Sequence, residues 1–347
     1  MTQTYLHTVG DSTLDNLFWM IPWQGTLEQA KKLTVEGRLE SATAFTVISH
    51  AYDGFTTESV LNGDRIGRVL PGRGSVITSY LKEKGQGEVK PLENLSKVVA
   101  LDSEGTHYVI LSVGGNDFRE RLMNPIALLT EIPRVQERYL QIVKQIRELQ
   151  GRDIRPLLMF QYRTGVNQDP YHIHTLLRWV GRVAVALNLV CLATLALAPL
   201  GVYKEVLSRR TGVILGTLAS GLLFLSTRGV PFKVTLEVVK GHDLGMTVFG
   251  ALLEKLYAPI LEEAKTHHIP ILDLSNTLDP YHDENYISGI EPGIEGSKTI
   301  AEGLAHIVKE HDYQGASRLY AKPPRGEGPY TSTINDPSRW KVQYISQ

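Results

Sequence analysis

The sequence predicts an α/β fold with a mostly parallel sheet that is covered by helices on both faces. Apolar runs of strand length alternate along the chain with longer segments whose apolar residues recur at helical spacing. This alternation is typical of strand–helix–strand units, in which the strands run parallel and the helices cover the sheet. Polar residues follow several of the apolar runs directly, and sites in such sheets gather at the carboxyl ends of strands.

The expected elements follow in chain order. Strands are predicted at 5–10, 44–49, 108–113, 156–160 and 269–274. Thr26 is a suitable cap for a helix with Leu27, Ala30, Leu33 and Leu39 on one face. Further helical stripes are predicted at 125–150, 252–264 and 300–308.

Composition limits the classes of function. The formal net charge of the 347 residues is −1, which gives no basic face for nucleic acid. Cys191 is the only cysteine, so no disulfide forms within the chain and a reducing compartment is expected. The N-terminus carries no secretion signal, so we expect a cytoplasmic domain.

Three loops at strand ends carry residues suited to acyl-transfer chemistry. Ser12 follows Gly10 after the first strand, Gly54 follows the second, and Asn116 follows the third. A serine hydroxyl can act as a nucleophile, while backbone N–H groups and a carboxamide can stabilise an oxyanion. Each loop alone is equally compatible with an ordinary turn or helix cap. Their shared position at strand ends is the reason to group them.

In order and spacing, these loops resemble the SGNH (GDSL-type) hydrolase family. The matching blocks are Gly10-Asp11-Ser12, Gly54 within Tyr-Asp-Gly-Phe-Thr-Thr, and Gly114-Gly115-Asn116-Asp117, and the matching chain spans about 1–165 and 247–312. The resemblance implies a three-layer α/β/α fold with a flavodoxin-like sheet.

The same resemblance implies hydrolysis or transfer of an ester-bound acyl group, with no cofactor and no metal. Ser12 would be the nucleophile, and the oxyanion hole would consist of Ser12 N–H, Gly54 N–H and Asn116. Asp11, Gly114 and Asp117 are expected to support these groups.

The last block departs from the family pattern, which is Asp-x-x-His before the last helix. Here Ser288 stands at the aspartate position and Glu291 at the position of the base histidine. A free glutamate has a pKa about two units below that of histidine, and burial could raise it. His282, in Asp279-Pro280-Tyr281-His282, is an alternative base that lies nine residues too early. The sequence leaves open whether Glu291, His282 or neither serves.

The family pattern is interrupted by an insertion at 171–246. It contains two uncharged stretches, 183–200 and 211–227, of about 27 and 25 Å in helical form, close to a hydrocarbon core of roughly 30 Å. We interpret 183–227 as a membrane hairpin, spanning or re-entrant. A soluble lid or dimer contact is the alternative, but it should show a polar stripe.

These features predict four segments. They are the first part of the hydrolase domain at 1–170, the hairpin at 171–246, the second part of the domain at 247–315 and a polar tail at 316–347. The main hypothesis is a membrane-associated serine esterase or lipase acting on a small-molecule or lipid ester. The alternatives are a catalytically silent binding module at a membrane and a carbohydrate O-deacetylase. The oligomeric state is not predicted.

Overall fold

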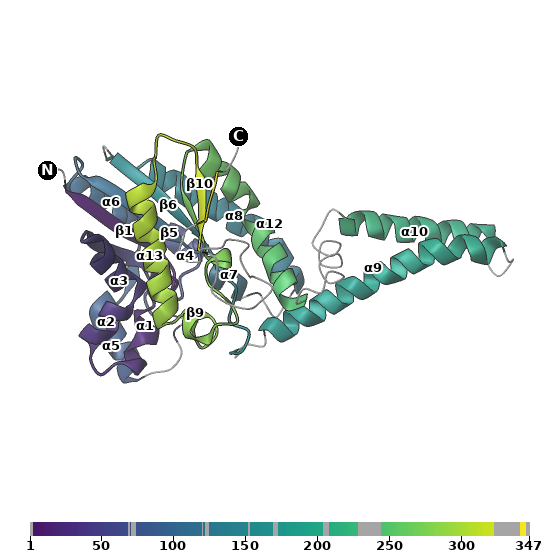
Figure 1. Ribbon diagram of the computed structural model, residues 1–347, viewed down its shortest axis with the longest axis horizontal. Coiled ribbons are helices and arrows are strands. Elements are labelled where there is room, and N and C mark those ends of the chain that lie inside the picture. Colours follow the sequence, from purple (N-terminus) through teal and green to yellow (C-terminus); the bar gives the residue numbers. More distant parts are fainter. Residues whose placement is uncertain are drawn as a thin grey trace. The chain divides into compact units, whose positions relative to one another are not determined.

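A seven-stranded sheet forms the centre of the larger of two units, which comprises 1–169 and 256–347 (Figure 1). The computed structural model describes residues 3–68, 70, 74–119, 121, 125–151, 153–168, 173–203, 208–227, 244–322 and 341–344. The strands are β1 (Thr4–Gly10), β2 (Thr46–Ala51), β5 (Thr106–Ser112), β6 (Asp153–Phe160), β7 (Ile271–Asp273), β10 (Arg318–Ala321) and β11 (Lys341–Tyr344).

The strand order is β11-β10-β7-β6-β5-β1-β2, and every neighbouring pair except β10–β11 is parallel. The predicted α/β class with a mostly parallel sheet is therefore confirmed. The first five of these strands in sequence have the spatial order 2-1-3-4-5, which is the flavodoxin-like arrangement. The chain reverses direction across the sheet between β2 and β5, so the carboxyl ends of β1, β2 and β5 flank the switch point.

Helices cover both faces of this sheet (Figure 1). On one face, Leu6, Ile110 and Met159 pack in one buried cluster with α3 (Val35–Thr43) and α13 (Ile294–Glu310). The other face is contacted by α4 (Thr57–Asn62), α6 (Pro91–Leu101) and α8 (Pro125–Arg147). The remaining helices and strands of this unit are α1 (Leu17–Met20), α2 (Leu27–Leu33), α5 (Ser75–Lys84), α7 (Gly115–Arg119), β3 (Asp64–Arg65), β4 (Glu88–Val89), β8 (Tyr286–Ile287) and β9 (Glu291–Pro292).

The predicted helix after Thr26 is two helices. Thr26 Oγ1 accepts a hydrogen bond from Gln29 N at 3.2 Å and caps α2 as expected. Thr34 then ends α2 and caps α3, with its Oγ1 accepting from Gly37 N at 3.1 Å. A threonine side chain that competes for backbone donors explains the break.

The C-terminal segment also differs from the prediction of a polar tail at 316–347. Arg318–Ala321 forms β10, parallel to β7, and Lys341–Tyr344 forms β11, antiparallel to β10. Tyr320 is buried, so an aromatic anchor brings this segment into the sheet despite its polar neighbours. The domain therefore continues beyond 315.

The second unit comprises 170–255 and contains the predicted apolar hairpin. Among the described residues of this unit, α9 (Ile173–Tyr203) and α10 (Arg209–Thr227) pack against each other, and α12 (Leu244–Thr266) begins here. Within the described residues, one segment, Thr175–Leu197, is long and apolar enough to span a membrane.

Three buried histidines form a ladder across β2, β1 and β5. His107 Nε2 lies 2.8 Å from the Asp102 carbonyl, His7 Nε2 lies 3.0 Å from His107 Nδ1, and His50 Nε2 lies 3.4 Å from His7 Nδ1. Because the carbonyl only accepts, one proton on each ring is enough to satisfy all three contacts. Burial lowers the pKa of His7 to about 3 and that of His50 to about 4.

The ladder predicts an acid-sensitive fold. Between these lowered pKa values and the ordinary value near 6.5 the unfolded chain binds more protons, so stability falls as the pH drops below about 6.5. Relative to pH 8, His50 should lower the free energy of unfolding at pH 5 by about 2 kcal/mol. Urea unfolding of wild type and His50→Gln at both pH values measures this. The stability difference between the two proteins should shift by that amount, and a constant difference would contradict the assignment. Subtraction removes the opposing contribution of buried carboxyl groups that both proteins share.

Candidate functional site

Backbone hydrogen bonds bring three strand ends together around Gly10. Asp11 N donates to Ser112 O at 3.0 Å, which joins β1 to β5, and Tyr52 N donates to Gly10 O at 3.0 Å, which joins β2 to β1. Gly10 has a φ of +141°, and a Cβ there would overlap the Ser112 carbonyl. Only glycine permits this approach. Ser12 therefore begins the turn at the meeting point of three strands.

The Gly54 loop lies next to Asn116. Gly54 has a φ of +84°, and Asn116 Nδ2 donates to Phe55 O, the carbonyl of the following residue, at 3.0 Å. This bond uses one of the two amide hydrogens of Asn116. Among the described residues, no backbone acceptor is bound by the N–H of Ser12 or of Gly54. The three predicted oxyanion donors are thus brought into one region.

Asp117 connects the second and third loops. Its carboxylate accepts from Thr57 N at 2.9 Å and from Thr57 Oγ1 at 2.6 Å, and Arg138 Nη2 lies 3.3 Å away. Thr57 is the first residue of α4, where backbone donors lack helical partners. Gly114, with a φ of +118°, forms the sharp turn before this segment. Both residues hold the loop that carries Asn116.

Glu291 is the group that the structure places beside Ser12. The Ser12 side chain interacts with the Glu291 carboxyl and lowers its pKa, and both residues are buried. Glu291 lies in the short hairpin of β8 and β9, directly before α13. Asn16 ties this hairpin to the Ser12 turn, because its Nδ2 donates to Pro292 O at 3.0 Å and to Ser297 Oγ at 2.7 Å.

The surroundings of Glu291 adjust its acidity. Burial raises its pKa, the Ser12 hydroxyl and the positive charge of Arg119 lower it, and the charge of Asp15 raises it. Arg119 Nη1 lies 3.9 Å from Glu291 Oε1, and Glu291 Oε2 has no hydrogen-bond partner among the described residues. Asp53 is also buried, and its pKa is raised by burial and by the charge of Glu291. A raised pKa brings a carboxyl closer to the value that suits proton transfer at neutral pH.

Asp11 is the second carboxyl that adjoins Ser12 in the chain. Its Oδ1 accepts from Thr13 N at 3.1 Å, and its Oδ2 accepts from Gln161 Nε2 at 3.3 Å. Burial raises the pKa of Asp11 to about 7. Thr13 Oγ1 also donates to Gln161 Oε1 at 3.1 Å. Asp11 therefore stabilises the Ser12 turn through its hydrogen bonds to Thr13 and to Gln161, the residue that follows β6.

His282 and Ser288 are not joined to Ser12 by any contact among the described residues. The His282 side chain is 53% exposed, and its Nε2 lies 3.5 Å from Glu284 Oε2. Ser288 adopts a φ of +50°, and its hydroxyl donates to the preceding carbonyl, Ile287 O, at 2.8 Å. The Ser288 hydroxyl thus bonds within its own turn. Among the described residues, it makes no hydrogen bond to Glu291 of the kind that the family's aspartate would make to the base.

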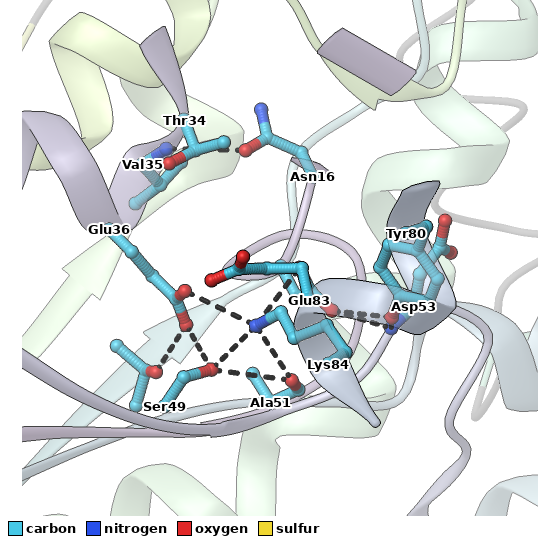
Figure 2. Close-up of polar contacts among 12 residues, drawn as sticks. Asn16, Thr34, Val35, Glu36, Ser49, Ala51, Asp53, Tyr80, Glu83 and Lys84 are labelled. Carbon is cyan, nitrogen blue, oxygen red and sulfur yellow. Dashed lines mark hydrogen bonds and ion pairs between the residues drawn. The ribbon is translucent and has the colours of Figure 1, made fainter. Parts of the chain in front are cut away.

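Several buried polar residues at the site carry no family motif. Figure 2 shows Lys84 surrounded by Glu36, Ser49 and Ala51, with Tyr80 beside Asp53. Asp15 follows Ser12 by three residues, whereas Lys84 looks in the sequence like an ordinary lysine at the end of a helix. Only long-range contacts distinguish it. In the part of the chain that the structure describes, no group of three or more His, Cys, Asp or Glu residues is arranged to hold a metal.

Comparison with known proteins adds similarity of shape alone. No family model and no curated protein matches the sequence. Among solved structures, an aryl esterase from M. smegmatis is 12% identical with a TM-score of 0.43, covering 89% of this chain and 100% of that one. A carbohydrate acetylesterase from Sinorhizobium meliloti is 11% identical with a TM-score of 0.43, covering 88% of this chain and 98% of that one. Similarity at this level assigns no activity to the chain.

Proposed function

We propose that this protein is an ester hydrolase or acyltransferase with Ser12 as nucleophile and Glu291 as general base. The observation that carries the proposal is the buried Glu291 carboxyl, which interacts with the Ser12 side chain at the meeting point of three strand ends. A base must come within hydrogen-bond reach of the proton it removes, and Glu291 is the carboxyl positioned to do so at Ser12. His282 makes no such contact, so the proposal gives it no role.

The reaction proceeds in two steps that share these groups. Ser12 Oγ attacks the acyl carbon while its proton moves to the Glu291 carboxylate, and the carbonyl oxygen becomes an oxyanion. Ser12 N–H, Gly54 N–H and Asn116 Nδ2–H donate to that oxyanion. When the ester C–O bond breaks, the leaving alkoxide takes the proton from Glu291. Water or an alcohol then attacks the acyl carbon and gives its proton to Glu291. The bond between the acyl carbon and Ser12 Oγ breaks, and Ser12 Oγ takes that proton back from Glu291 as the acyl product leaves.

The proposal extends to membrane attachment through 183–227. Apolar side chains on both helices are more than half exposed: Trp179, Leu187, Leu189, Val190, Leu197, Val213, Ile214, Leu218 and Leu222. The residues that α9 and α10 bury include Gly181, Asn188, Gly212 and Ala219. A narrow buried stripe with small residues, inside an apolar exterior, is the pattern of helices packed in lipid. A soluble lid would instead expose polar side chains. A lipid or lipid-linked ester would suit a tethered site, with the soluble part on the cytoplasmic side.

The first prediction of the proposed function concerns the nucleophile and the base. A fluorophosphonate probe should label wild type at Ser12 and fail to label Ser12→Ala. Glu291→Gln should label about 100- to 10,000-fold more slowly, because the serine proton then has no acceptor. Intact-mass spectrometry over time measures the rate.

Glu284→Gln is the matched control, since it makes the same change at an exposed carboxylate of the same loop, and it should label at the wild-type rate. His282→Ala should also be unaffected. If wild type is not labelled at any pH, the binding-module alternative replaces the enzyme. If His282→Ala fails and Glu291→Gln does not, the base assignment is wrong.

The second prediction concerns pH. Because Glu291 must be ionised to accept a proton and burial raises its pKa, labelling should increase with pH, with a midpoint above the ordinary glutamate value of about 4.3. Glu291→Gln should lose this dependence. Asp11, whose pKa burial raises to about 7, remains present in both proteins. An unchanged pH profile in the variant would therefore assign the dependence to Asp11 instead.

The third prediction concerns the hairpin. Full-length protein should sediment with phosphatidylcholine vesicles, and the double variant Leu187→Glu/Val190→Glu should bind at least about tenfold more weakly, because charges in a hydrocarbon core are costly. Leu101→Glu is the control, since Leu101 is 86% exposed on α6 in the other unit. Equal sedimentation of wild type and the double variant would refute the tether.

A further inference from the structure

A buried ion cluster adjoins the Asp53–Gly54 turn (Figure 2). Lys84 Nζ lies 3.1 Å from Asp15 Oδ1 and 3.3 Å from Glu36 Oε2, and it donates to Ser49 Oγ at 2.7 Å. The Lys84 side chain is 9% exposed and that of Asp15 is 1% exposed. The cluster therefore brings a cation and two carboxylates out of water at the edge of the candidate site.

The cluster joins four elements of the chain. Lys84 ends α5, Glu36 belongs to α3, and Glu36 Oε1 accepts from Thr8 Oγ1 of β1 and from Ser49 Oγ of β2 at 2.6 Å each. Asp15 lies in the turn that carries Ser12. Lys84 is thus the point through which the Ser12 turn is held against the first two strands.

The second oxygen of Asp15 reaches the oxyanion loop. Asp15 Oδ2 accepts from Asp53 N at 3.2 Å and from the Tyr80 hydroxyl at 2.6 Å, and the Tyr80 oxygen also accepts from Asp53 N at 3.1 Å. Tyr80 is fully buried. The Asp53 amide is therefore held from two sides, and the next N–H along the chain is that of Gly54.

This arrangement is an expensive way to gain stability. Removing three ions from water costs several kcal/mol per ion before pairing, and apolar side chains of similar volume commonly stabilise a fold at least as well. Backbone bonds already join the strand ends at Gly10. What the cluster adds is a fixed direction for the peptide that follows Asp53.

We propose that Lys84, Asp15 and Tyr80 are positioning residues that aim the Gly54 N–H at the oxyanion. Asp15 and Tyr80 hold the Asp53 amide, and Lys84 keeps Asp15 in place as an anion. None of the three touches the reacting atoms. The inference rests on the proposed function, since the oxyanion belongs to that reaction.

The test compares Lys84→Met and Tyr80→Phe with wild type. The control is Lys82→Met, which removes the same charge from an exposed position of the same helix. Saturation kinetics of fluorophosphonate labelling should give a maximal rate about 10- to 100-fold lower in both variants, at unchanged half-saturating probe concentration. A merely structural role would lower only the fraction of protein that reacts. Amide hydrogen exchange of 52–55, followed by mass spectrometry, should be faster in both variants and unchanged in Lys82→Met.

Each outcome decides one question. Equal maximal labelling rates in wild type and in folded Tyr80→Phe would overturn the positioning role, and this variant remains informative if Lys84→Met does not fold. If wild type is not labelled at all, the proposed reaction is refuted, and this result says nothing about the positioning of the Asp53 amide. Hydrogen exchange then decides the geometry: faster exchange of 52–55 in Tyr80→Phe supports the positioning, and unchanged exchange overturns it.

Discussion

The close approach of β1 to β5 at Gly10 is the constraint on which the site depends. A side chain at this position would overlap the Ser112 carbonyl, and the bond from Asp11 N to that carbonyl would be lost. The turn that carries Ser12 would then move away from the third strand. Because Tyr52 N binds Gly10 O, the second loop would follow. One glycine therefore controls the distance between the serine and both sources of oxyanion donors.

Electrostatics is the second feature that organises the site. Glu291, Asp53, Asp15 and Asp11 are all buried near the Ser12 turn, and burial raises the pKa of each. Lys84 and Arg119 provide positive charge, one buried and one partly exposed. The balance keeps a carboxyl beside Ser12 that is less acidic than one in water. The proposal gives this carboxyl the role of general base.

The two units of the chain differ in the kind of side chain that they expose. The sheet unit buries its apolar side chains between helices and strands, as a soluble domain does. The hairpin of α9 and α10 buries a narrow stripe and exposes most of its apolar side chains. Exposed apolar surface of this extent marks a region that contacts a partner or a membrane, and we propose that lipid covers it. The insertion leaves the strand order of the sheet intact because it falls between β6 and β7 in the sequence.

The sequence by itself determined the α/β class, most of the strands and the apolar hairpin, because these depend on periodicity and on local turn residues. It also identified Ser12, Gly54, Asn116 and Glu291 as candidates, since the residues of these short turns can be read from the local sequence without knowing where the strands lie in the sheet. It could not show that Thr34 divides a helix or that Tyr320 brings the C-terminal segment into the sheet, because competing local bonds and distant burial decide these points. Only the tertiary structure brought Glu291 to Ser12, aided by the hydrogen bond from Asn16 Nδ2 to Pro292 O, and left the His282 side chain more than half exposed. Lys84 and Tyr80 are likewise held by contacts with residues far away in the sequence, and such contacts cannot be predicted from the spacing of neighbouring residues.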